Sequence, residues 1–277
     1  MKPKRTRTAR LLRTILLAFI ALIANFPVLT VILNSLRSTN EIMASSSIIP
    51  THLTLGNYVT IVVQSNFLIF FRNSLIVALS GTFVSIIVAG LAGYAMSRFH
   101  SKFLRVYGSS LLALQMFPAI LVLIPLFVLF RIAGLVDTYW SVILLYITGN
   151  LPFAIWMYRG FFDSIPKELE ESSWIDGCSR LQSFMKIALP LSGPGVAAVG
   201  IFSFLFSWNE YLIAMIFLRN NARMTIPVGL QLFMQQYQTD WGSLFAAATL
   251  AMLPPLLFSF FAQKYMVYGA VSGAVKG

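Results

Sequence analysis

The sequence predicts an all-α, polytopic membrane protein with six transmembrane helices and both termini in the cytoplasm. Hydrophobic residues make up 58% of the 277 residues and charged residues only 10%, whereas about 25% of an average soluble domain is charged. The mean hydropathy is +0.79. Apolar runs of ~20 residues, the length that an α-helix needs to cross a bilayer, recur along the chain with basic residues beside them.

The first apolar run, 11–33, follows a basic stretch and is predicted to be an uncleaved first span. It is longer than the apolar core of a signal peptide, which has roughly 7–15 residues, although Asn25 and Pro27 interrupt it. We therefore expect a basic cytoplasmic N-terminus (1–10), a transmembrane domain (11–266) and a cytoplasmic C-terminal tail (267–277).

Five further apolar segments are predicted to cross the membrane: 73–96, 106–130, about 140–158, 194–218 and 244–265. In the second span, Gly81, Gly90 and Gly93 provide small surfaces where helices can approach closely. Prolines inside the third, fourth and sixth spans are expected to bend those helices, and Pro254-Pro255 to break the last.

The basic residues set the orientation of these spans. Six spans place both termini on one side, and that side carries 15 of the 20 Lys and Arg residues against five on the other. Because cytoplasmic loops carry an excess of Lys and Arg, both termini and the connection 161–190 are predicted to be cytoplasmic. The net charge of +11 is thus explained by membrane orientation, and no nucleic acid is expected as a partner.

Catalytic and metal-binding chemistry finds little support in the sequence. Cys178 is the only cysteine, and His52 and His100 lie far apart without companion ligands. We find no phosphate-binding loop, nucleophile elbow or pair of catalytic carboxylates. We therefore expect no catalytic residue, no metal site and no cofactor bound by this chain.

The connection 161–190 is unusual because it carries five of the nine acidic residues: Asp163, Glu168, Glu170, Glu171 and Asp176. Pro166 suits the first turn of a short helix, and Gly177 can take the left-handed conformation that ends one. A second helix is expected from about Ser179 to Ala188, with Pro190 preventing its continuation. The pattern predicts an amphipathic, acidic pair of helices, and the residues alone also allow a solvated loop.

The same segment resembles the cytoplasmic coupling loop of permease subunits of bacterial ABC importers. Their pattern is EAA, three residues, G, nine residues and I-x-LP. Here it is matched in register, with Ser172 and Ser173 in place of the two alanines. The resemblance implies that this loop docks on a separate ATPase subunit. The residues it assigns to coupling are Glu171, Ser172, Ser173, Asp176, Gly177, Ile187, Leu189 and Pro190.

Further segments resemble the second permease of maltose-type importers: NSLIVALSG, LAGYAMSRF, PLFVLFRIAGLVDT and the closing GAVSGAVKG. IIPTHLTLGNYVTIV also resembles a segment before the second span of sugar permeases, although 66–71 equally suits an interfacial helix. The resemblance implies that Val275, Lys276 and Gly277 contact the ATPase; a flexible tail without function is the alternative.

The resemblance also implies the partners and the setting. We expect a second homologous permease subunit in a heterodimer, two ATPase subunits that bind ATP and Mg²⁺, an extracytoplasmic solute-binding protein, and the bacterial inner membrane. The expected function is one half of a translocation pathway for a carbohydrate, coupled by alternating access. A permease for a non-sugar solute or a secondary carrier is the alternative.

Asn209 and Glu210 lie in the polar segment SWNEY inside the fifth predicted span. Glu210 lies about 12 Å from the end of that span at 1.5 Å per residue. An ionised group facing lipid there costs about 2.5 kcal/mol or more, so Glu210 is expected to face protein or water. A substrate or gate role and a structural hydrogen bond to a neighbouring subunit both remain open.

Overall fold

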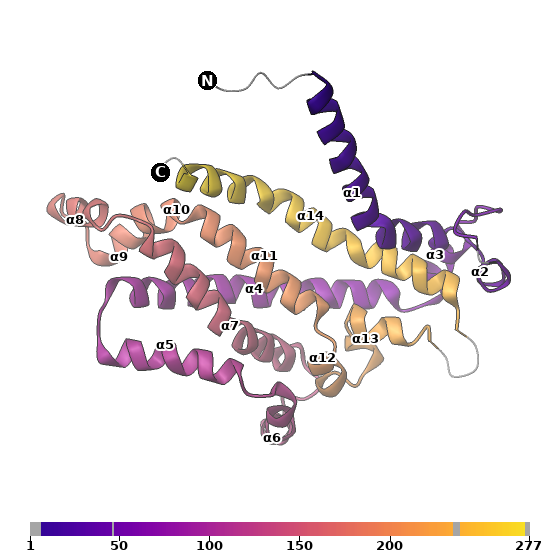
Figure 1. Cartoon of the computed structure of the whole chain (residues 1–277). Coiled ribbons are helices and arrows are strands. Elements are labelled where there is room, and N and C mark those ends of the chain that lie inside the picture. Colours follow the sequence, from indigo (N-terminus) through magenta and orange to yellow (C-terminus); the bar gives the residue numbers. More distant parts are fainter. Residues whose placement is uncertain (1–6, 46, 235–238, 275–277) are drawn as a thin grey trace. The chain divides into compact units, whose positions relative to one another are not determined.

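The computed structural model describes residues 7–45, 47–234 and 239–274, and side chains within residues 11–264. Over these residues the chain is helical, and its only β feature is an isolated antiparallel bridge between Met234 and Thr239. The chain forms two compact units. The first comprises Met1–Phe67 with Leu230–Ala251, and the second comprises Leu68–Gly229 with Met252–Gly277. Figure 1 shows the order of the helices.

Four helices in the described part of the chain are long and apolar enough to cross a membrane: α1 (Arg7–Ser35), α4 (Phe67–Arg98), α7 (Tyr139–Asp163) and α14 (Trp241–Ala274). Two bent pairs raise this number to six if each pair is one span: α5 (Lys102–Gln115) with α6 (Ala119–Ile132), and 180–191 with α11 (Gly193–Asn209). The first four predicted spans and the sixth fall on these elements in order, whereas the fifth, 194–218, covers α11 and continues past it. Residues 67–71 begin α4, so they do not form a separate interfacial helix.

The third predicted span is not one helix, because α5 and α6 meet at an angle of 100°. Pro118 lies at the junction, with the extended backbone angles φ −62° and ψ 114°. Proline lacks an N–H and disfavours helical geometry in the residue before it, which explains the break. Pro125 and Pro152 instead lie inside continuous helices, and so does Pro254-Pro255, which was wrongly predicted to break the last span.

The fifth predicted span, 194–218, is also interrupted. Helix α11 ends at Asn209, Glu210 is extended, and α12 (Leu212–Phe217) follows. The Glu210 carboxylate accepts hydrogen bonds from the backbone N–H groups of Ile213 (2.9 Å) and Ala214 (3.2 Å). The first N–H groups of a helix have no partner inside it, so Glu210 caps α12 from within the chain.

The core of the second unit forms where α4, α7 and α11 pack together (Figure 1). A Cβ atom on Gly93 of α4 would lie 2.6 Å from the Tyr158 Cβ and 3.0 Å from the Ile155 carbonyl oxygen of α7. A Cβ atom on Gly81 would lie 3.4 Å from the Ser207 hydroxyl of α11. The predicted close approach is therefore present, and at Gly93 it tolerates no side chain.

The beginning of α4 is tied to three other segments of the second unit. The Asn73 side-chain amide donates to the carbonyl oxygens of Ala222 (3.0 Å) and Met224 (2.9 Å), and its oxygen accepts from the Tyr139 hydroxyl (2.7 Å). Ser74 accepts from the Ile226 N–H at 2.8 Å. These bonds hold the 3₁₀ turn Asn221–Arg223 and the start of α13 (Ile226–Gln231) on α4.

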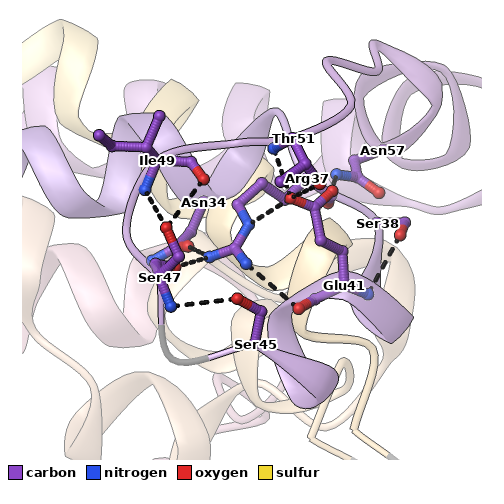
Figure 2. Close-up of polar contacts among 9 residues, drawn as sticks. All are labelled: Asn34, Arg37, Ser38, Glu41, Ser45, Ser47, Ile49, Thr51 and Asn57. Carbon is purple, nitrogen blue, oxygen red and sulfur yellow. Dashed lines mark hydrogen bonds and ion pairs between the residues drawn. The ribbon is translucent and has the colours of Figure 1, made fainter.

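The first unit folds around Arg37, which is 2% exposed (Figure 2). The Arg37 guanidinium bonds to the Glu41 carboxylate (3.1 Å), the Asn34 side chain (3.0 Å) and the Ser47 carbonyl oxygen (2.6 Å). The backbone N–H of Thr51 donates to the same carboxylate and, with Arg37, holds the pKa of Glu41 below its usual value. The connection after α1 is therefore ordered by a buried arginine.

Short helices complete the first unit: α2 (Thr39–Ala44) and α3 (Gly56–Val59), the latter running into the π-helical turn Thr60–Gln64. The Asn57 amide donates to the carbonyl oxygens of Ser35 and Arg37 at 2.8 Å each (Asn57 is drawn in Figure 2). Thr39 donates to Asp240 (2.7 Å) and accepts from the Gly242 N–H (2.9 Å). The start of α14 is therefore held by the segment that follows α1.

Substitutions of Glu210 separate a capping role from a substrate role. Glu210→Leu leaves the N–H groups of Ile213 and Ala214 unpaired and is expected to destabilise the protein by about 1 kcal/mol, the usual cost of a lost cap. Glu210→Gln keeps an acceptor oxygen and should be milder. Thermal unfolding of the purified variants, together with uptake assays, measures both effects. A changed solute concentration dependence with unchanged thermal stability in both variants would contradict the capping role.

Candidate functional site: the acidic loop

The acidic loop 161–190 begins in the last residues of α7, and beyond them it forms two short helical segments joined at Gly177, as the sequence predicts. Helix α8 (Glu168–Ile175) is followed by Asp176 at its C-cap position, and Gly177 has φ +85°. The Gly177 N–H bonds to the Trp174 carbonyl oxygen and the Cys178 N–H to that of Ser173. This pair of bonds is a Schellman motif, which requires a left-handed residue at the position of Gly177.

The second segment begins with a capping box. Ser179 accepts from the Gln182 N–H (3.3 Å), and the Gln182 side chain accepts from the Ser179 N–H (2.8 Å). Helix α9 (Arg180–Ser183) then passes into a π-helical turn, Phe184–Ala188, and into α10 (Leu189–Leu191).

The prediction that the second helix stops before Pro190 is wrong. The Leu189 N–H reaches back five residues to the Phe184 carbonyl oxygen, which widens the turn before the proline. Pro190 then lies in the first turn of α10, where its missing N–H costs nothing. The chain instead changes direction after Leu191, where segment 180–191 and α11 meet at 77°.

One face of the loop is buried against the helices of the second unit. Glu170 is 1% exposed, and Ser173, three residues later, is also buried. The Ser173 hydroxyl donates to the Glu170 carbonyl oxygen (2.7 Å) and lies 2.8 Å from the Ser183 hydroxyl oxygen. Ser173 therefore joins the two helical segments, a contact for which its small side chain is suited.

The last turns of α4 hold this buried face. The Glu170 carboxylate accepts from the Tyr94 hydroxyl and from the Arg98 guanidinium (2.7 Å). Arg98 also donates to the Phe162 and Ile165 carbonyl oxygens, at 2.9 and 3.1 Å. From the sequence, Glu170 is expected only as one of the acidic residues of the loop, and its pairing with Tyr94 and Arg98 is not predicted. The available signal was the spacing of Glu170 and Ser173 on one helix face.

The opposite face of the loop is exposed. Of the predicted coupling residues, Glu171, Ser172, Asp176, Gly177 and Pro190 are exposed, Ile187 and Leu189 are half-buried, and Ser173 is buried. Exposed apolar side chains lie among the carboxylates: Leu169, Trp174, Ile175, Leu181 and Met185. Ile175 is 87% exposed. Acidic and apolar side chains that are exposed together in this way suit contact with another protein.

The other predicted residues lie elsewhere. Asn209 and Glu210 are at the opposite end of α11 from the loop, and Asn209 donates to the Leu205 carbonyl oxygen (2.8 Å). Val275, Lys276 and Gly277 lie outside the described residues. The backbone of 267–274, expected to be part of a tail, continues α14. No group of three His, Cys, Asp or Glu side chains that could hold a metal occurs in the described part of the chain.

This chain is similar to known proteins over most of its length. Residues 81–268 match the family model described as "Binding-protein-dependent transport system inner membrane component". The inner membrane ABC transporter permease protein YcjP of Escherichia coli is 33% identical over 264 residues, 94% of each chain. The arabinooligosaccharides transport system permease protein AraQ of Halalkalibacterium halodurans is 34% identical over 281 residues, 100% of each chain.

A solved structure shows the same fold. A chain in the crystal structure of a bacterial ABC transporter that imports the acidic polysaccharide alginate matches with a TM-score of 0.80 and 23% sequence identity. The match covers 95% of this chain and 99% of that chain. The family match and the permease relatives over nearly the full length, together with several apolar helices, show that this chain belongs to the family of binding-protein-dependent transport system inner membrane components, as a multi-pass permease subunit rather than an enzyme.

Proposed function

We propose that this chain forms half of the translocation pathway of a bacterial ABC importer for a carbohydrate and is coupled to a separate ATPase by its acidic loop. The observation that carries the coupling is the exposed face of α8, where Glu171 and Asp176 lie beside exposed Trp174 and Ile175. Five apolar side chains exposed on one loop are costly in water, and a partner that covers them removes that cost.

The proposed mechanism is alternating access. Closure of two ATPase subunits on ATP moves the loop, and the loop turns the pathway outward to accept solute from an extracytoplasmic binding protein. Such coupling requires that ATP and the loaded binding protein each favour one state of the permease over the other. The second half of the pathway is proposed to be a homologous permease subunit.

The proposed substrate is a sugar or oligosaccharide. Support comes from the relative AraQ, whose name specifies arabinooligosaccharides, and from the segments that resemble maltose-type permeases. A permease for a non-sugar solute has the same fold and loop, so substrate identity must be tested directly. Membership in a binding-protein-dependent family leaves the secondary carrier without support.

The orientation follows from the 15 to five distribution of basic residues, which favours cytoplasmic termini and a cytoplasmic acidic loop. Cys178 should then react with a membrane-impermeant maleimide only after the membrane is opened. Asn221→Cys in a Cys178→Ala background should react in intact cells. Opened membranes control for reactivity of each thiol, and labelling of Cys178 from outside intact cells would disprove this six-span orientation.

The docking role of the loop is tested by Glu171→Lys and Gly177→Val. The first reverses an exposed charge, and the second penalises the left-handed residue that joins the two helices. We expect inserted, folded permease that either loses the ATPase or shows solute-stimulated ATP hydrolysis lowered about tenfold, the equivalent of ~1.4 kcal/mol. The measurement is ATPase retention, hydrolysis and sugar uptake in the purified, reconstituted complex.

Two variants serve as controls for this test. Gly160→Val places the same side chain on a nearby helical glycine that has no atom within 4 Å of the added Cβ, so it should resemble the wild type. Glu171→Gln removes the charge without reversing it and should give an intermediate result. Wild-type hydrolysis and uptake in both Glu171→Lys and Gly177→Val would mean that the loop is only a solvated connection. Gln182→Ala is unsuitable as a control, because Gln182 belongs to the capping box.

A further inference from the structure

We infer that Arg98 is a positioning residue whose ion pair with Glu170 makes the acidic loop and α4 move as one body. Through α4, a displacement of the loop then reaches the segment 222–226 at the other end of that helix. This inference rests on the proposed coupling function. It adds the internal path by which movement of the docked loop is carried through the subunit.

Three polar residues on one face of the last turns of α4 reach into the loop. Tyr94, Ser97 and Arg98 are spaced i, i+3 and i+4, so their side chains project from the same side of the helix. Tyr94 and Arg98 bind Glu170, and Ser97 donates to the Asp163 carboxylate at 2.6 Å. The face is therefore bonded both to α8 and to the end of α7.

Arg98 holds more than one partner because its guanidinium is a planar fork. One side of the fork lies on Glu170, and its terminal nitrogens also reach the carbonyl oxygens of Phe162 and Ile165, on either side of the turn that leads into α8. Lysine carries the same charge on a single nitrogen and cannot keep all of these contacts at once. The fork therefore fixes the angle between the loop and α4 as well as the distance between them.

Tyr94 extends the link to the second half of the loop. Its ring packs against Phe184, with 4.8 Å between the ring centroids, and against Phe162 at 5.5 Å. Phe184 is buried and belongs to the π-helical turn before α10. Both halves of the loop are therefore attached to the same turn of α4, so bending at Gly177 does not detach one half.

Helix α4 is well suited to carry a displacement. Its 32 residues form one helix without proline, about 48 Å long at 1.5 Å per residue. At its beginning, Asn73 and Ser74 hold the backbone of 222–226 by three hydrogen bonds. The two ends of α4 are therefore bonded, through buried polar side chains, to the acidic loop at one end and to this segment at the other.

A purely structural role for the ion pair makes a different prediction from a positioning role. If Arg98 only holds the fold together, Arg98→Lys lowers the amount of folded complex, and each complex that forms works normally. If Arg98 positions the loop, complexes form and bind the ATPase, but hydrolysis no longer drives uptake. The ratio of solute transported to ATP hydrolysed, measured per purified complex, separates the two.

The first experiment compares Arg98→Lys with Arg159→Lys in the full complex of permease, ATPase and binding protein. Arg159 lies near the same loop, but its ion pair with Asp163 (3.5 Å) is partly exposed, so its loss should cost little. Arg98→Lys should retain the ATPase and lower solute transported per ATP about tenfold, within the range for lost coupling between sites. Tyr94→Phe removes only the hydroxyl and should lower the same ratio less, which keeps the test valid if Arg98→Lys fails to fold.

The second experiment measures movement directly. Spin labels at Lys167→Cys and Phe83→Cys, both exposed positions, report the distance between the loop and α4 in a Cys178→Ala background. This distance should be the same with and without ATP in otherwise unaltered complexes, and should change with ATP when Arg98→Lys is added.

The outcomes distinguish this inference from the proposed function. If the unaltered permease binds no ATPase, both the proposed function and the positioning role of Arg98 are overturned. If the unaltered complex binds the ATPase and transports solute, but the distance between the labels on the loop and α4 changes with ATP, only the positioning role is overturned. A wild-type transport ratio in both Arg98→Lys and Tyr94→Phe likewise overturns only the positioning role.

Discussion

The orientation of the acidic loop depends on one buried carboxylate. An ionised carboxylate removed from water is costly unless it is paired and hydrogen-bonded, and Glu170 meets this condition only against Arg98 and Tyr94. Once Glu170 faces inward, helical geometry places Glu171 about 100° around α8, on the solvent side. The buried pair therefore decides which residues of α8 are exposed, and the neighbouring residues Glu170 and Glu171 lie in opposite environments.

The rest of the second unit is shaped by how helices pack in a membrane. Lipid is as apolar as the side chains, so association depends on close contact between backbones and on shared hydrogen bonds. Gly93 permits α4 to lie directly on α7, and Ser203 of α11 donates to the Asn150 side chain of α7 at 3.3 Å. This packing holds α4 in place while the polar groups at its two ends attach other segments to it.

The sequence predicted the features that depend on local chemistry. Apolar length and flanking charge located the spans, and the need for positive φ located the joint at Gly177. It failed where the outcome depends on distant partners: Arg98 lies 72 residues before Glu170, and the burial of Arg37 depends on groups supplied by a folded connection. Proline was ambiguous for a related reason. Pro118 breaks a helix, whereas Pro125 and Pro190 lie within helical segments. Pro190 is accommodated by a π-helical turn that the local sequence did not predict.

The two faces of the loop use different chemistry because they face different demands. A permanent attachment can use a buried ion pair, because the two charges never have to separate and return to water. Misalignment is also resisted, because it would leave a buried charge unpaired. A surface that docks on another protein must remain soluble when the partner is absent, and the exposed carboxylates around the apolar side chains of this loop keep it hydrated. An ion pair on the outer face would be screened by salt and would contribute little to fixing direction. With the ion pair inside and the adaptable contacts outside, the docking that we propose can be reversible while the attachment of the loop to α4 stays fixed.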